Sequence, residues 1–130
     1  MTWLRIPAVC VIYLCSVFAA GWVVQLCCDR ILRQVDSPEL RAWVEQGIPG
    51  GGRWIGWLER FLITTFVLLG EPSASAVVLA AKGILRFAEI SGRPHEGQRV
   101  VAEYVILGTL LSFSLATGIS AAGRILLGEL

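Results

Sequence analysis

The chain has 130 residues, of which 55% are hydrophobic and only 16% are charged, and its mean hydropathy is +0.69. Soluble domains carry about 25% charged residues, so this composition is typical of a membrane protein, and the length provides for one domain, residues 1–130. The net charge of +1 argues against a nucleic-acid-binding protein, which would present a basic patch or stripe.

The first predicted element is a transmembrane helix over residues 6–28. Its uncharged apolar run from Pro7 to Leu26 matches the length of about 20 residues that crosses a bilayer. The core of a secretory signal is shorter, about 7–15 residues. We therefore interpret this run as a retained membrane helix, which ends at Asp29 and Arg30.

A short helix is predicted next, over residues 37–46. Ser37 is a suitable N-cap, and Pro38 suits the first helical position. One side of this helix is apolar and carries Leu40, Trp43 and Val44. The segment is therefore either a helix along the membrane surface or a plain solvated connector. The glycine- and proline-rich residues 47–52 predict a flexible joint after it.

Three further transmembrane helices are predicted over residues 54–70, 73–90 and 102–123. A tight turn over residues 70–73 joins the first two, and Pro72 suits the first turn of the helix that follows. A polar loop over residues 91–98 joins the last two. The predicted fold class is all-α: an integral membrane protein with four transmembrane helices and a short interfacial helix.

Arginine residues are unevenly divided between the predicted loops. Four lie between the first and second transmembrane helices and two between the third and fourth, whereas the other side has two arginines and the acidic Glu71. Positively charged loops stay preferentially in the cytoplasm. We therefore expect the longer loops to face the cytoplasm, with both termini and the Glu71 turn outside.

Five charged residues are predicted to form one layer in the cytoplasmic part of the bundle. Residues equally far from the Glu71 turn lie at similar depth, which brings the charges of the second and third helices within one helical turn, about 5.4 Å. An acid at the start of the fourth helix lies on the same side. The layer comprises Glu59, Arg60, Lys82, Arg86 and Glu103.

Charged side chains inside a bilayer are costly unless they pair or face water. Three interpretations of the layer follow. It is an ion-pair network with Arg60 and Lys82 reaching towards lipid headgroups, an anion site for a phospholipid headgroup or phosphorylated ligand, or the polar lining of an ion or solute path. The residues alone leave all three open.

The fourth helix carries small residues four apart, which form a ridge on one face: Gly108, Ser112, Ala116 and Ser120. A second such series consists of Ser114, Gly118 and Ala122. Small residues let helix backbones approach closely, which is a main source of helix association in lipid. The first ridge packs either within one chain or against a second copy.

Residues with catalytic or metal-binding chemistry are sparse. The four cysteines show no metal-ligand spacing, and we interpret them as small apolar helix residues: Cys10, Cys15, Cys27 and Cys28. His95 is the single histidine, and no Ser/His/Asp set or HExxH motif is present. We therefore predict no enzymatic activity, no metal and no cofactor.

Three segments resemble the C-terminal membrane segment of a bacterial integral-membrane family that is catalogued as a domain of unknown function. They read G-R-W-I-G-W-L-E-R from Gly52, A-A-K-G-I-L-R-F from Ala80, and A-E-Y-V-I-L-G-T-L-L-S-F from Ala102. Order and spacing match over residues 52–116, and Gly83 stands where the family pattern has serine. The resemblance implies a protein of the bacterial cytoplasmic (inner) membrane whose motif includes the five charged residues.

The combined prediction is a small multi-pass membrane protein without enzymatic activity. It is an oligomeric membrane module or a subunit of a membrane complex, with a role related to a pore or to transport. The alternative is a lipid- or partner-binding scaffold that uses the cytoplasmic charged layer. Its expected partners are membrane lipid and a second copy or another membrane protein, with no nucleic acid.

Overall fold

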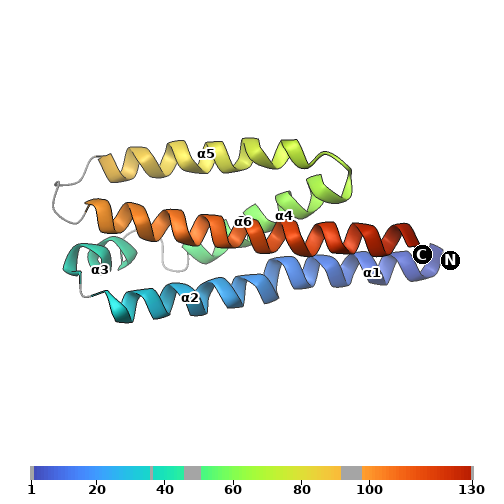
Figure 1. Cartoon of the computed structure of the whole chain (residues 1–130), viewed down its shortest axis with the longest axis horizontal. Coiled ribbons are helices and arrows are strands. Elements are labelled where there is room, and N and C mark those ends of the chain that lie inside the picture. The colour runs from blue at the N-terminus through green and yellow to red at the C-terminus, as the bar shows by residue number, and fades with distance from the viewer. Residues whose placement is uncertain (1, 36, 46–50, 92–97, 130) are drawn as a thin grey trace.

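The computed structural model describes residues 2–35, 37–45, 51–91 and 98–129, and all regular structure in these ranges is helical (Figure 1). A first continuous helix comprises α1 (Thr2–Leu14), the π-helical turn η1 (Cys15–Ala19) and α2 (Ala20–Gln34). It is followed by α3 (Pro38–Glu45), α4 (Gly51–Leu68), α5 (Pro72–Ser91) and α6 (Gln98–Glu129). The all-α prediction is confirmed.

The predicted helices are present, and most are longer than the sequence indicated. The prediction that Gly51 and Gly52 belong to a flexible joint is wrong, because both lie in the first turn of α4. In a first turn the backbone N–H groups have no partner within the helix, so residues usually found in loops are tolerated there. The ends of the predicted polar loop, Ser91 and Gln98, likewise belong to α5 and α6. Residues 92–97 of this loop, the rest of the predicted joint and Gln46 lie outside the described residues.

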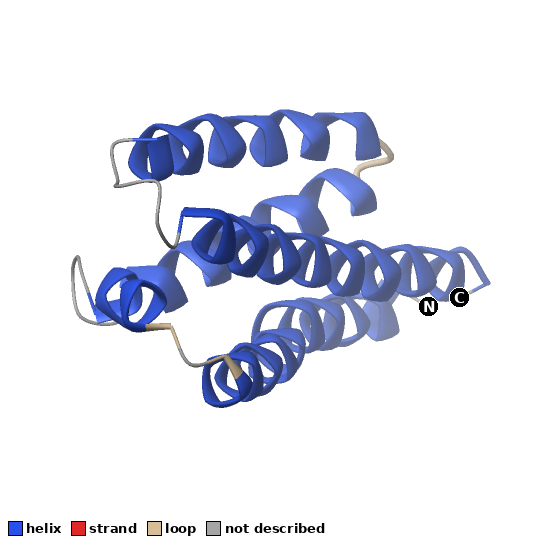
Figure 2. Cartoon of the chain, turned by 60° about the vertical axis from the view of Figure 1, so that its left-hand side comes forward, coloured by secondary structure: helices blue, strands red, loops and turns tan. Residues whose placement is uncertain are grey.

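The helix α6 is the centre of the bundle, since it contacts α1, η1, α2, α3, α4 and α5. The helix α5 packs mainly against α4 and less closely against α6, and Figure 2 shows it at the edge of the bundle. The start of α1 and the end of α6 lie at the same end of the molecule as the α4–α5 turn, and α3 lies at the other end (Figure 1).

Two local signals in the sequence are realised in the backbone. Ser37 caps α3, because its Oγ accepts a hydrogen bond of 3.4 Å from the Leu40 N–H. Gly70 has a φ of 85° and ends α4. The N–H of Gly70 donates to the Val67 carbonyl, and the N–H of Glu71 to the Phe66 carbonyl, at 3.1 and 2.8 Å. These two bonds form a Schellman motif, in which glycine adopts the left-handed conformation without strain.

By length and composition, two helices can cross a membrane: Thr2–Gln34, with a hydropathy of 2.1, and Gln98–Gly128, with 1.8. The other two predicted spans do not meet this criterion. Both α4 and α5 contain three charged residues, which lower their hydropathy. On composition, two of the four predicted spans are therefore supported.

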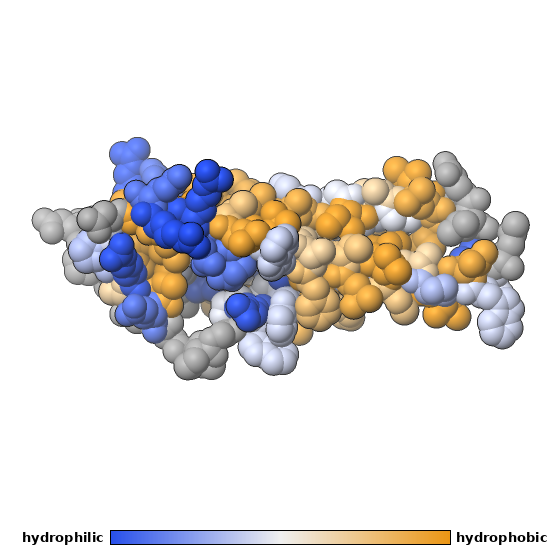
Figure 3. All heavy atoms as spheres, turned by 90° about the horizontal axis from the view of Figure 1, so that it is seen from below, coloured by the Kyte–Doolittle hydropathy of each residue, from blue (hydrophilic) through white to orange (hydrophobic). Residues whose placement is uncertain are grey.

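Polar residues are unusually frequent in the interior. Among the described residues, eight polar or charged residues are buried, the same number as buried hydrophobic ones. Large apolar side chains lie outside: Trp3, Val77 and Phe87 are 86%, 70% and 73% exposed. Figure 3 shows one face on which hydrophilic residues gather at the α3 end and hydrophobic residues cover most of the rest. Both the frequent buried polar residues and the large exposed apolar side chains are unusual for a soluble domain.

Candidate functional site

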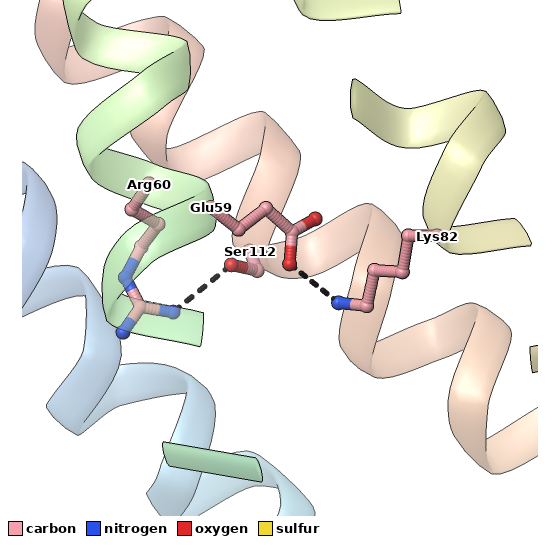
Figure 4. Close-up of polar contacts among 4 residues, drawn as sticks. All are labelled: Glu59, Arg60, Lys82 and Ser112. Carbon is pink, nitrogen blue, oxygen red and sulfur yellow. Dashed lines mark hydrogen bonds and ion pairs between the residues drawn. The ribbon is translucent and has the colours of Figure 1, made fainter. Parts of the chain in front are cut away.

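A buried guanidinium group lies at the middle of the bundle. Arg60 of α4 is only 4% exposed, and it is held by two other elements. Its Nε donates to the Val17 carbonyl at 3.0 Å. Its Nη1 donates to Ser112 Oγ at 3.0 Å, as Figure 4 shows. A charge out of water is tolerated only when such partners replace its hydration. Arg60 therefore links α4 to both η1 and α6.

The π-helical turn coincides with this contact. Val17 belongs to η1, as does Ser16, the other residue of this turn that bonds to α4. Single π-helical turns inside α-helices are rare and often mark functional sites. Here the altered turn presents the Val17 carbonyl to a side chain of a neighbouring helix.

Two glycines provide the space that the Arg60 side chain occupies. A Cβ on Gly21 of α2 would lie 2.5 Å from Arg60 Nη2, and a Cβ on Gly56 of α4 would lie 3.1 Å from Nη1. The first distance is shorter than van der Waals contact permits. Gly56 and Arg60, the first and last residues of the segment GWLER, are one helical turn apart. The Arg60 side chain can fold back along α4 because Gly56 has no side chain at this position.

A chain of hydroxyl groups continues from Arg60 along the interior. Thr64 Oγ1 lies 2.6 Å from Ser16 Oγ and accepts a hydrogen bond of 3.1 Å from Ser120 Oγ. It also bonds to the Arg60 carbonyl at 2.8 Å. Ser16, Thr64 and Ser120 are fully buried, each at 0% exposure. Together with Arg60 they connect η1, α4 and α6 by polar contacts.

The acid next to Arg60 points to the opposite side of α4. Glu59 is 4% exposed, and its Oε2 lies 2.6 Å from Nζ of Lys82 on α5 (Figure 4). Successive helix residues are about 100° apart, so Glu59 and Arg60 reach different neighbours. Counting from the α4–α5 turn placed Glu59 and Lys82 at one depth, and the structure joins them. Among the described residues, Glu59 Oε1 has no hydrogen-bond partner.

In the described part of the chain, the remaining members of the predicted layer, Arg86 and Glu103, each make a contact of their own. Arg86 lies over the Trp43 ring of α3, with 5.3 Å from Cζ to the ring centroid. Glu103 pairs with Arg99 of its own helix at 3.0 Å, and both side chains are largely exposed. The i, i+4 spacing on α6 gives Glu103 a nearer partner than α5 does. The prediction that Arg60 reaches towards headgroups is also wrong, since Arg60 is buried inside the bundle.

The small-residue ridge packs within the chain. Ala116 is buried in a core cluster with Ile63 and Val67, and Ser112 and Ser120 bond to Arg60 and Thr64 of α4. A Cβ on Gly108 would lie 3.5 Å from Cys28 Sγ of α2. Of the two arrangements that the sequence left open, the structure has the intramolecular one.

A groove lies between α5 and α6, near the ends that lead to residues 92–97. It has a volume of about 650 Å³, and its lining includes Lys82, Arg86, Arg99 and several apolar residues. Sequence reasoning missed Arg99 as a member of this site, although it is one of the loop arginines. It also missed Ser16, Thr64 and Gly21, which have no signal other than small or hydroxyl side chains within apolar runs.

No family model, curated protein or solved structure matches the chain. The resemblance to a bacterial membrane family stays a prediction. Within the part of the chain that the structure describes, no three His, Cys, Asp or Glu side chains are grouped so that they could hold a metal ion.

The Glu59–Lys82 pair gives a first testable prediction. Glu59→Gln or Lys82→Met leaves one partner without its counter-charge in a buried position, and such losses amount to about 3–5 kcal/mol. Each single variant should therefore unfold at lower denaturant concentration in detergent micelles, whereas the double variant should lose much less than the sum of the two. Glu103→Gln, at an exposed pair, is the control and should change little. Additive losses would show that the two side chains do not interact.

Proposed function

We propose that the protein is a non-enzymatic integral membrane protein, in which α4 and α5 cross the bilayer together with the two more hydrophobic helices, and that it acts as a compact scaffold within the membrane. The observation that carries this proposal is the combination of buried polar groups with large exposed apolar side chains. Arg60, Glu59 and Thr64 are buried and bonded, while large apolar side chains cover the outside.

The length of the charged helices suits a span. The helix α4 has 18 residues and α5 has 20, which correspond to about 27 and 30 Å at 1.5 Å per residue. The hydrocarbon core of a bilayer is about 30 Å thick. A charged residue at the centre of a lone helix costs about 2.5–3.5 kcal/mol on insertion scales. Pairing Glu59 with Lys82 and enclosing Arg60 reduces this cost for the assembled bundle.

The proposed location is the bacterial cytoplasmic membrane, with the α3 end in the cytoplasm. The excess of loop arginines at that end supports this orientation through the positive-inside rule. The start of α1 and the end of α6 lie at one end of the bundle, as an even number of spans requires (Figure 1). The protein's two termini are then on the outer side.

Labelling of single cysteines tests the proposal of four spans. Ser73 and Ser91 are exposed residues at opposite ends of α5. In a variant without the four native cysteines, Ser73→Cys should react with a membrane-impermeant maleimide in right-side-out vesicles, and Ser91→Cys only in inverted vesicles. Labelling of both positions from the same side would mean that α5 does not cross the membrane.

An oligomeric module is a second candidate, and one observation favours it. The second series of small residues on α6 is exposed in the single chain: Ser114, Gly118 and Ala122. A Cβ on Gly118 would meet nothing within 4 Å, so this face has room for another backbone. A contact between copies would use this face, since the ridge from Gly108 to Ser120 is occupied within the chain.

Crosslinking in native membranes tests this second candidate. If two copies meet at Gly118, Gly118→Leu should reduce the crosslinked dimer at least several-fold, because leucine separates the two backbones. Gly128→Leu is a matched control, since Gly128 is also on α6 and is also open. A wild-type protein that yields no dimer, or equal yields in all three proteins, would exclude association through this face.

A further inference from the structure

The groove between α5 and α6 changes from polar to apolar along its length. Ser91, Gln98 and Arg99 line it where the two helices approach residues 92–97. Arg86 follows, and Lys82 lies about one turn deeper. Further from that end the lining is mostly apolar and includes Leu79, Val105 and Leu110. An amphiphile with a polar head and an apolar chain matches this gradient.

The charge of the groove has one sign. Its described lining contains three cations, Lys82, Arg86 and Arg99, and no acidic residue. Lys82 is engaged with Glu59. Arg99 is 91% exposed, and a solvent-exposed pair such as Arg99–Glu103 contributes little stability, so its guanidinium can exchange to another anion at small cost. Arg86 lies with its guanidinium over the ring of Trp43, which positions it in the lining of the groove.

We propose that this groove binds an anionic phospholipid of the cytoplasmic leaflet, with its phosphate at Arg86 and Arg99 and an acyl chain along the apolar part. This inference rests on the proposed membrane location and adds the ligand to it. Guanidinium groups bind phosphate through two parallel hydrogen bonds, which suits the two arginines. Anionic lipids are concentrated in that leaflet.

The apolar wall distinguishes a lipid from a soluble anion. Phe87, Ile106 and Leu110 line the groove and are also exposed on the surface, at 73%, 55% and 51%. A chain in the groove is therefore continuous with the surrounding bilayer. A free phosphate or sugar phosphate would leave this wall without a partner, while an acyl chain covers it.

The test measures thermal stabilisation of the purified full chain by added lipid. Phosphatidylglycerol and phosphatidylcholine are titrated into detergent micelles, with glycerol 3-phosphate as a soluble probe. A lipid that binds only the folded state raises the unfolding temperature, and the stabilisation grows with the logarithm of one plus the lipid concentration divided by its Kd. We expect phosphatidylglycerol to stabilise the protein more than phosphatidylcholine does, and glycerol 3-phosphate to have no effect. Arg99→Gln and Arg86→Gln should each raise at least tenfold the phosphatidylglycerol concentration that is needed for a given rise in unfolding temperature.

Arg53→Gln is the control, because Arg53 is an exposed arginine of α4 at the same end but outside the groove. An equal loss in Arg53→Gln would indicate general attraction to acidic lipid and overturn the site. Equal stabilisation by both lipids, or by glycerol 3-phosphate, would also overturn it. If Arg86→Gln does not fold, the exposed Arg99 decides the outcome alone. These results are independent of the cysteine labelling, so the site can fail while the four-span proposal stands.

Discussion

The packing of the bundle depends on how the guanidinium of Arg60 is enclosed, by two hydrogen-bond acceptors and two glycines. Val17 offers a carbonyl from a π-helical turn, Ser112 offers a hydroxyl, and Gly21 and Gly56 omit their side chains. A charge at this depth is stable only while these groups surround it, because unsatisfied donors in an apolar medium are costly. The position of α4 against the first helix and α6 is thereby fixed, and the hydroxyl groups one turn further on continue the same contact.

The other side of α4 determines how α5 attaches. Glu59 holds α5 through Lys82, and α5 packs mainly on α4 rather than on α6. The space that remains between α5 and α6 is the cationic groove. Two adjacent residues of opposite charge therefore have different roles. Arg60 holds the interior of the bundle together, and Glu59 positions α5, which forms one wall of the proposed lipid site.

Much of the fold could be predicted from the sequence, because long apolar runs and caps are local signals. The runs indicated the helices, Ser37 and Pro38 marked the start of α3, and depth counted from the α4–α5 turn brought Lys82 level with Glu59. The hydrogen bond from Arg60 to Val17 could not be predicted, since a backbone carbonyl in a π-helical turn has no sequence signature. Glu103 was misassigned because depth alone does not specify which side of a helix faces a neighbour.

The central claim is that the space beside Arg60 fixes the packing of α4 against the first helix, and Gly21→Ala tests it most directly. Alanine is the better helix former, by about 1 kcal/mol, so the substitution should stabilise an unconstrained helix. Its Cβ would lie 2.5 Å from Arg60 Nη2. Unfolding in detergent should show that Gly21→Ala destabilises the wild-type protein but not an Arg60→Met variant, in which the guanidinium is absent. An equal effect of Gly21→Ala in both backgrounds would contradict the account.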